Sequence, residues 1–288
     1  MPVTLGDVGV WVFSGALTDD AENIAGQIEE MGYSALWLGG ATPDLELPRR
    51  LMNGSERLVV ATGIVSIWAE TPAELAFNWQ RVTREDPARF LLGLGVSHAH
   101  IVEREEDRRY EQPYERMVAF LDGLDEATPR VPPEDRALAA LGPRMLRLSA
   151  ERSAGAHPYL TPPEHTRRAR AILGPGPLLA PEQMVVLETD PSRAREIGRA
   201  TLARYLRLPN YTNNLRRLGF TDEDFADGGS DALVDGIVAW GTTEEIEARI
   251  REHHDAGADH VCVQVLTAPD APMPPLDQWR ELAPALVR

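Results

Sequence analysis

The chain has 288 residues, 43% of them hydrophobic, and a formal net charge of −16 at pH 7. This charge argues against nucleic acid and anionic membrane surfaces as partners. All 29 basic residues are arginines, which excludes lysine Schiff-base chemistry, and the one cysteine, Cys262, excludes an intrachain disulfide. The sequence has no apolar run of about 18 residues and no secretory leader pattern, so we expect no membrane span and a cytoplasmic protein.

Short apolar segments alternate with amphipathic segments along the chain. The amphipathic segment after the first apolar segment is predicted as a helix with its apolar residues on one face. A Thr-Pro-Ala-Glu capping box at 71–74 predicts the start of another helix. Eight apolar segments are predicted as strands: 8–14, 35–40, 58–66, 90–96, 137–141, 156–160, 183–187 and 260–266. Residues 208–240 interrupt the alternation with polar, Asn-rich and Asp/Gly-rich stretches.

Eight strands that alternate with helices predict an α/β protein whose parallel strands close into a (β/α)₈ barrel. A doubly wound sheet is the alternative, and the strand count and the absence of a complete glycine fingerprint argue against it. Without a linker or a low-complexity stretch, we expect one domain over residues 1–288. The irregular segment 208–240 is expected to cover the mouth of the barrel and to shape substrate choice.

The predicted strands end in small, apolar or backbone-exposing residues, among them Gly39, Gly40, Thr62, Gly63 and Ile64. In such barrels the site lies at these strand ends. They hold no cluster of acids and histidines for a metal, and the chain has no G-x-S-x-G motif. A glycine-lined mouth of this kind favours a large planar cofactor.

Two glycine motifs lie near these strand ends. Gly93 and Gly95 resemble the start of a dinucleotide fingerprint, but His98 stands where the third glycine belongs, so we interpret them as close-packing glycines. The turn Gly142-Pro143-Arg144-Met145 opens a helix whose free N–H groups, together with Arg144, suit a phosphate. An ordinary turn with a solvated arginine is the alternative.

Two histidines, His98 and His157, lie where predicted strands end. Either is a candidate general acid or base near neutral pH. The alternative is a hydrogen-bonded histidine that shapes the pocket wall. Cys262 alternates with valines in a predicted strand and is interpreted as a core residue, not a nucleophile.

Several segments together resemble the bacterial luciferase-like superfamily and, more narrowly, its actinobacterial branch of coenzyme F420-dependent oxidoreductases. They are EEMGYSALWLGG, VVATGIVSIWAETPAELA, RFLLGLGVSHAHIVE, ALGPRMLRLSAERSAGAHPYLTPPEHT, GPGPLLAPEQMVVLE and AWGTTEEIEARIREHHDAGADHVCVQVL. The resemblance implies a barrel that holds a flavin-like ring at its mouth. It also implies a non-proline cis peptide at Gly63–Ile64.

The resemblance implies a set of cofactor-binding positions. They are Gly39, Gly40, Thr62, Gly63, Ile64, Val96, Ser97, Gly142, Pro143, Arg144, Met145 and Ala156, with His98 and His157 beside them. The chain departs from some relatives, because Gly40 and Ala41 stand where these carry an acid and a histidine, and His98 stands where some carry a glutamate. Known sugar-phosphate chemistry therefore does not transfer, and arginines must replace phosphate-binding lysines.

The sequence hypothesis is an oxidoreductase that moves a hydride between F420 and a small organic molecule. One alternative is an FMN-dependent monooxygenase on the same fold. Another is a non-catalytic protein that binds F420 or flavin, because the mouth has few ionisable residues. By family analogy we expect a homodimer.

Overall fold

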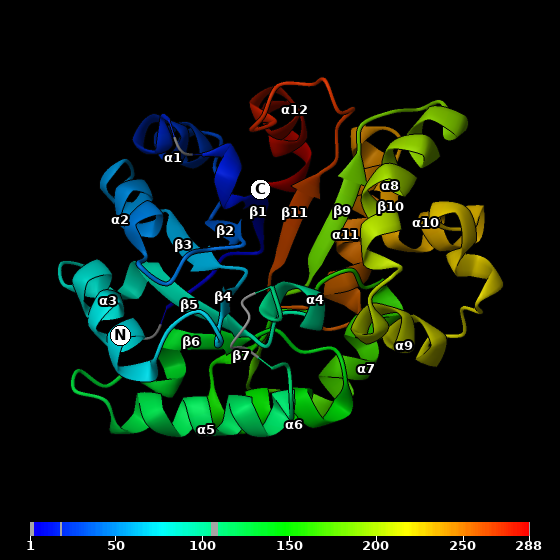
Figure 1. Ribbon diagram of the computed structural model, residues 1–288. Coiled ribbons are helices and arrows are strands. Elements are labelled where there is room, and N and C mark those ends of the chain that lie inside the picture. The colour runs from blue at the N-terminus through cyan, green and yellow to red at the C-terminus, as the bar shows by residue number, and fades with distance from the viewer. Residues whose placement is uncertain (1–2, 18, 105–108, 288) are drawn as a thin grey trace.

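The computed structural model describes residues 3–17, 19–104 and 109–287 as one curled parallel sheet with helices on its outside (Figure 1). The strands are β1 (Val8–Phe13), β2 (Ala35–Gly39), β3 (Val59–Thr62), β4 (Val65–Ser66), β5 (Phe90–Gly95), β6 (Arg136–Leu138), β7 (Gly155–Ala156), β8 (Leu178–Leu179), β9 (Glu182–Val186), β10 (Val238–Trp240) and β11 (Val261–Val265). Their order is β10-β9-β11-β1-β2-β3-β5-β6-β7-β8, and β4 pairs with β5.

The sheet closes on itself through β8 and β9. Only Ala180 and Pro181 separate these two strands, and β8 pairs with β7 while β9 pairs with β11. The hydrogen bonds Ala180 N to Ala156 O and Glu182 N to Pro158 O, both 2.9 Å, continue the ladder across the interruption. The two strands therefore act as one barrel strand. The predicted barrel of eight strand positions is confirmed, with β10 as an addition to it.

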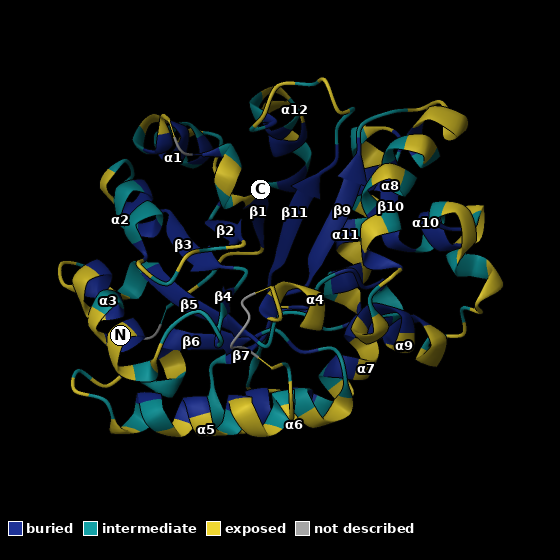
Figure 2. Cartoon of the chain, in the orientation of Figure 1, coloured by how far each residue is buried: buried dark blue, intermediate teal, exposed yellow. Residues whose placement is uncertain are grey.

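Helices surround the barrel, most of them on its outside and others at its mouth (Figure 1). They are α1 (Ala21–Glu30), α2 (Glu46–Asn53), α3 (Pro72–Thr83), α4 (Ala99–Val102), α5 (Pro113–Glu126), α6 (Pro143–Arg152), α7 (Pro163–Leu173), α8 (Pro191–Tyr205), α9 (Pro209–Arg217), α10 (Asp231–Ile237), α11 (Thr243–Asp255) and α12 (Leu276–Leu286). At the predicted capping box the Thr71 hydroxyl accepts a hydrogen bond from Glu74 N at 3.3 Å. Figure 2 shows the strands buried and the helices exposed on their outer faces. No helix in the described ranges is long and apolar enough to cross a membrane.

Three predicted strands differ from the observed ones. The third is split into β3 and β4 at the Gly63–Ile64 peptide, which is cis. The fifth and sixth end early, at Leu138 and Ala156, because the chain then turns to line a cavity at the mouth of the barrel. An apolar run predicts where a strand begins better than where the chain leaves the sheet.

The segment 208–240 contains the strand β10, which the sequence analysis did not predict. The short strand β7 pairs with β8 and not with β9. It therefore leaves one edge of β9 open, and β10 pairs with β9 there. Three apolar residues are too few for a periodic signal, and only the free edge of β9 makes them a strand.

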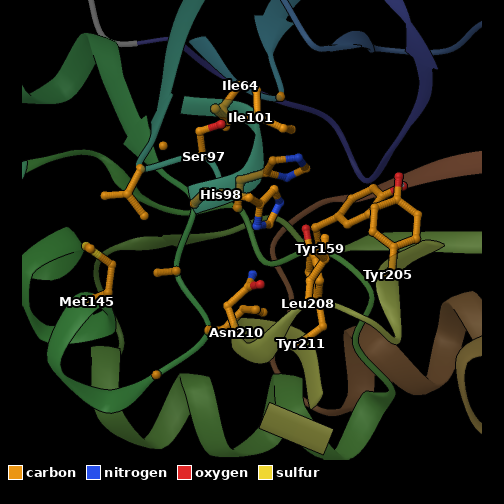
Figure 3. Close-up of a pocket in the computed structure, with 18 of the residues that line it drawn as sticks. Ile64, Ser97, His98, Ile101, Met145, Tyr159, Tyr205, Leu208, Asn210 and Tyr211 are labelled. Carbon is orange, nitrogen blue, oxygen red and sulfur yellow. The ribbon is translucent and has the colours of Figure 1, made fainter. Parts of the chain in front are cut away.

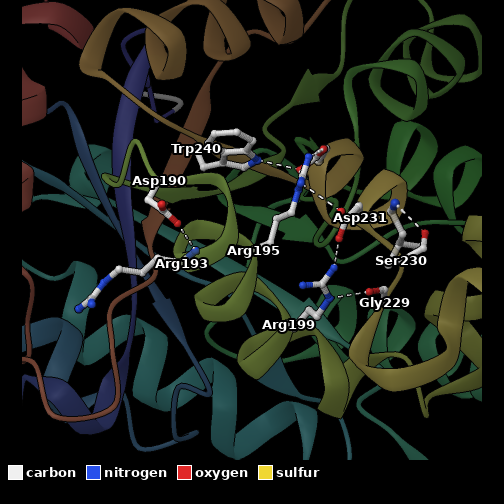
Figure 4. A network of polar contacts seen from close by, with 10 residues as sticks. Asp190, Arg193, Arg195, Arg199, Gly229, Ser230, Asp231 and Trp240 are labelled. Carbon is white, nitrogen blue, oxygen red and sulfur yellow. Dashed lines mark hydrogen bonds and ion pairs between the residues drawn. The ribbon is translucent and has the colours of Figure 1, made fainter.

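Ion pairs fasten this segment to α8 (Figure 4). The Arg195 guanidinium donates to both carboxylate oxygens of Asp235, at 2.9 and 2.6 Å, and to Asp231 at 3.0 Å. Arg199 donates to Asp231 and to Gly229 O. Because α8 ends at the mouth, these contacts set the position of the wall that it contributes there.

Candidate active site

A cavity of about 600 Å³ opens at the carboxyl ends of the strands. Strand ends supply one part of its lining, and α8 and α9 supply another. Figure 3 shows Met145 on one side, Tyr159 and Tyr205 on the other, and His98 between them. None of the described residues that line the cavity is acidic, although the chain has 45 Asp and Glu residues. The cavity therefore favours anionic or neutral ligands.

Most of the predicted site residues share this cavity. Those that line it are Gly40, Gly63, Ile64, Val96, Ser97, His98, Gly142, Met145 and His157. The fold thus brings together strand ends that lie up to 117 positions apart (157 minus 40). That these residues contact a cofactor stays a prediction.

Five predicted residues do not line the cavity. Gly39 leaves room for Trp11, because a Cβ at Gly39 would lie 2.1 Å from the indole. The Thr62 hydroxyl donates to Gly93 O at 2.9 Å and accepts from Gly93 N at 2.8 Å, so it ties β3 to β5. Ala156 is fully buried in β7. The remaining two, Pro143 and Arg144, begin α6.

Arg144 lies outside the cavity and contacts α5. Its guanidinium donates to Glu115 at 3.2 Å, and its Cζ lies 4.0 Å from the centroid of the Tyr114 ring. Arg217, from α9, lies at the cavity end of α6 instead. Its Nη1 is 3.7 Å from the point where a Cβ on Gly142 would stand.

The corner formed by Arg217 and the start of α6 suits an anion. The N-cap residue Gly142 has no side chain to cap the first turn, so the N–H groups of that turn point outward without a side-chain acceptor. Among the described residues Arg217 makes no ion pair and lines the cavity. A cation and a helix N-terminus therefore meet at one end of the cavity.

The floor of the cavity holds two buried ring nitrogens without partners. In the described part of the chain, Trp11 Nε1 and His157 Nε2 make no hydrogen bond. Both face Gly63, since a Cβ at Gly63 would lie 2.8 Å from Trp11 Nε1 and 3.0 Å from His157 Nε2. Buried polar atoms are normally hydrogen-bonded, so this pair is unusual, and it packs directly beneath Gly63 at the floor of the cavity.

The other nitrogen of His157 fixes the tautomer of the ring. Nδ1 donates to Ala180 O at 2.7 Å, because a carbonyl oxygen only accepts. The ring stacks on Trp37 with centroids 4.2 Å apart. Burial lowers the pKa of His157 to about 4, more than the hydrogen bond to Ala180 raises it. At neutral pH His157 Nε2 is therefore an acceptor and holds no proton.

Aromatic rings form a continuous arc on the opposite side of the cavity from α6. Trp11 contacts Phe13 and Tyr159, with ring centroids 4.8 and 5.2 Å apart. Tyr159 contacts Tyr205, and Tyr205 contacts Tyr211, both at 5.3 Å. All five rings line the cavity. We call this set the aromatic arc.

Hydrogen bonds hold the tyrosines of the arc. The Tyr159 hydroxyl donates to Gln264 Oε1 at 2.9 Å and lies 2.8 Å from the Tyr205 hydroxyl, which therefore donates to it. Behind them Glu182 is buried, and its Oε2 accepts from Leu160 N at 3.1 Å. Burial raises the pKa of Glu182 to about 8, so this carboxyl is protonated at neutral pH.

His98 lies between the two sides of the cavity. Its ring centroid is 5.5 Å from that of Tyr211 and 5.9 Å from that of His100. Burial lowers the pKa of His98, the neighbouring His100 lowers it further, and a hydrogen bond with Asn210 opposes both. His98 is only partly buried, so unlike His157 it can exchange a proton with solvent.

Arg204 lies at the outer end of the aromatic arc. Its Cζ is 5.1 Å from the centroid of Phe13 and 4.9 Å from that of Tyr205. It lines the cavity, and within the described ranges no carboxylate pairs with it.

The sequence analysis expected segment 208–240 over the mouth but named no single residue of it, and it did not expect α8 to contribute. Seven residues between 204 and 217 line the cavity. They are Arg204, Tyr205, Leu208, Asn210, Tyr211, Asn213 and Arg217. The run RYLRLPNYTNN carried a signal, because arginine, tyrosine and asparagine gather there just after a helix. Residues 218–240, also expected over the mouth, are absent from the lining and pack beside α8 instead.

These features define a class of protein: a parallel (β/α) barrel with a ligand cavity at the carboxyl ends of its strands. Across the described residues, no group of three His, Cys, Asp or Glu side chains could hold a metal ion. Residues 3–260 match the family model of the luciferase-like monooxygenases, and the chain belongs to that family.

Solved structures share this fold. An F420-dependent secondary alcohol dehydrogenase in complex with an F420-acetone adduct is similar at 14% identity, with a TM-score of 0.72 over 98% of this chain and 99% of that one. The F420-dependent tetrahydromethanopterin reductase of Methanopyrus kandleri has 15% identity and a TM-score of 0.70, with 97% of both chains covered.

A flavin enzyme is similar as well. The oxygenating constituent of 3,6-diketocamphane monooxygenase from Pseudomonas putida, in complex with FMN, has 12% identity and a TM-score of 0.68, with 98% of both chains covered. A search of the curated proteins finds no match.

Proposed function

We propose that this protein is an oxidoreductase that transfers a hydride between coenzyme F420 and a small organic substrate. The observation that carries the proposal is the cavity at the strand ends, which among the described residues is lined by no acid and by the small residues Gly40, Gly63 and Gly95. Small residues leave room there for a large planar heterocycle. The resemblance of the sequence to F420-dependent enzymes favours the deazaflavin.

The residues present fit such a cofactor. Gly63, Ile64, Val96 and Ser97 would lie along the ring, and the corner of Arg217 and α6 would hold its phosphate. When bound, F420 supplies the carbon that accepts or gives the hydride. The chain supplies the position of the ring and keeps water from its buried side.

The two histidines have different roles in this proposal. His157 Nε2 accepts a hydrogen bond, because Nδ1 holds the only proton of its neutral ring. The proton that accompanies hydride transfer therefore falls to His98, which lies between the cofactor side and the aromatic arc. Replacement His98→Gln is expected to lower turnover roughly 100-fold and to leave cofactor affinity within about twofold.

The test is a titration of the purified protein with F420 and, separately, with FMN, followed by ring fluorescence. We expect F420 to bind at least roughly tenfold more tightly than FMN. Tight FMN binding without F420 binding, together with oxygen consumption by the reduced complex, would establish the monooxygenase alternative instead. Tight F420 binding without turnover on a broad panel of alcohols, ketones and unsaturated acids would identify a carrier.

Three further points belong to the proposal. Residues 208–213 would select the substrate, supported by the four of them that line the cavity: Leu208, Asn210, Tyr211 and Asn213. The family likeness supports a homodimer, which light scattering of the purified protein tests. A cytoplasmic location rests on the sequence, and fractionation of the source cells tests it.

A further inference from the structure

We propose that Arg204 binds a carboxylate of the substrate, and that the substrate is an organic anion with a planar apolar body. This inference rests on the proposed function, because it assigns the cofactor to one half of the cavity and the substrate to the other. Three observations carry it: where the two cavity arginines lie, what holds Arg204 in place, and what covers the wall beside it.

The two arginines that line the cavity lie at opposite ends of it. Arg217 stands beside Gly142, which follows β6, and Arg204 stands over Phe13, which ends β1. Along the sheet the order β1-β2-β3-β5-β6 puts these strands four positions apart. In a barrel of eight strand positions, four apart is diametrically opposite. An anionic group bound by Arg217 and an anionic group bound by Arg204 are therefore two different groups.

Arg204 is held ready for a ligand that the chain itself does not supply. Phe13 and Tyr205 contact its guanidinium with their ring faces, at 5.1 and 4.9 Å from the centroids. Most arginines around it, such as Arg195 and Arg199, have carboxylate partners. Among the residues that the structure describes, no Asp or Glu pairs with Arg204 or lines the cavity. In a chain of net charge −16, this makes the mouth an exception that attracts anions.

The wall next to Arg204 differs from the wall next to Arg217. Beside Arg204 the aromatic arc presents five rings. Arg217 lies beside Gly142, and the lining residues around Gly142 in the chain are aliphatic or small: Ala139, Ala140, Leu141 and Met145. The arc suits a flat apolar body by stacking, and the guanidinium binds a carboxylate in a charge-assisted pair.

The experiment compares two probes that differ in charge and hardly in shape, 3-phenylpropanoate and 3-phenylpropanamide. Their dissociation constants are measured by calorimetry on the protein with F420 bound and again without it. We expect the carboxylate to bind roughly tenfold more tightly than the amide, and added salt to reduce the difference. Equal binding of the two probes, or no binding of either, would overturn the proposal.

Variants locate the effect. Arg204→Gln is expected to abolish the preference for the carboxylate, and Arg204→Lys to keep part of it, because lysine retains the charge but not the planar fork. The control is Arg207→Gln, an exposed arginine three residues further on that does not line the cavity. If Arg204→Gln weakens F420 and not the probe, the carboxylate belongs to the cofactor and the proposal is wrong.

The two proposals can fail separately. In one case F420 does not bind, while the protein alone still prefers the carboxylate probe and loses this preference in Arg204→Gln. The carboxylate site then stands and the cofactor assignment is wrong. If F420 binds and the preference is absent, the cofactor assignment stands and the carboxylate site falls.

Discussion

The floor and the far wall of the cavity are built in different ways. The floor consists of strand ends with uncharged side chains, of which His157 is anchored to the backbone by Ala180 O. The wall consists of Tyr159, with Glu182 buried behind it, and of side chains from α8 and α9, with Arg204, Tyr205 and Tyr211 held mainly by one another. We therefore expect substitutions in the floor to disturb the site strongly, whereas a single substitution in the wall can alter which ligand binds.

The largest effect is expected at the floor, from Gly63→Ala. A Cβ there would lie 2.8 Å from Trp11 Nε1 and 3.0 Å from His157 Nε2, which is too close, so the two rings of the floor would have to move. We expect F420 affinity to fall roughly 100-fold, as fluorescence titration measures. The control is Gly176→Ala, where a Cβ meets nothing within 4 Å. Unchanged affinity in Gly63→Ala would mean that the floor does not hold the cofactor.

The pH dependence of stability separates floor from wall next. The pKa of His157 is lowered to about 4, so the unfolded state gains a proton first as pH falls from 6.5 to 4, and stability decreases over that range. The pKa of Glu182 is raised to about 8, so the unfolded state loses its proton first as pH rises from 4.5 to 8, and stability again decreases. The floor thus weakens the fold in acid, and the wall weakens it in base.

The variant Glu182→Gln isolates the contribution of the wall. Its amide oxygen can still accept from Leu160 N, and it has no proton to lose. We expect the stability of Glu182→Gln relative to wild type to rise by about 3 to 4 kcal/mol in the free energy of unfolding from pH 5 to pH 8, measured with urea. Glu30→Gln, at an exposed carboxyl, is the control. A difference from wild type that does not vary with pH would mean that Glu182 is ionised in the folded protein.

A smaller effect is expected where floor and wall meet the start of α6. Arg217→Gln removes the cation beside Gly142 and should weaken F420 roughly tenfold, whereas Arg144→Gln should change affinity less than twofold because Arg144 already pairs with Glu115. Titration of both variants measures this directly. If Arg144→Gln weakens F420 binding and Arg217→Gln does not, the phosphate is held by Arg144, as the sequence analysis expects.

The smallest effect concerns the support of the wall. Asp235 accepts from Arg195 twice and from Trp240 Nε1 at 2.8 Å, so Asp235→Asn loosens α10 from α8. We expect unfolding to become easier by about 1 kcal/mol in urea, with F420 affinity unchanged because the floor does not depend on this contact. Asp277→Asn, at a side chain that is 93% exposed, is the control. A loss of F420 affinity in Asp235→Asn would mean that floor and wall are coupled.

Local patterns in the sequence were enough for the barrel, the capping box at Thr71 and most of the floor. Strand ends follow directly from apolar runs, and the carboxyl ends of parallel strands must meet at one rim, so Gly63, Val96, Ser97 and His157 could be assigned to the mouth in advance. The cis peptide at Gly63–Ile64 came from the resemblance and is confirmed.

Only the tertiary structure decided how helices deliver side chains to that rim. The direction of a side chain at the end of a helix depends on which neighbour it packs against. This packing places Arg144, in the first turn of α6, on Tyr114, and Arg217, in the last turn of α9, beside Gly142. In the same way the Thr62 hydroxyl hydrogen-bonds to the backbone of Gly93, and β10 forms because β9 has a free edge. Strand periodicity is a local property, whereas a helix-borne contact depends on packing between distant segments, and for that reason the sequence determined the floor and the fold determined the wall.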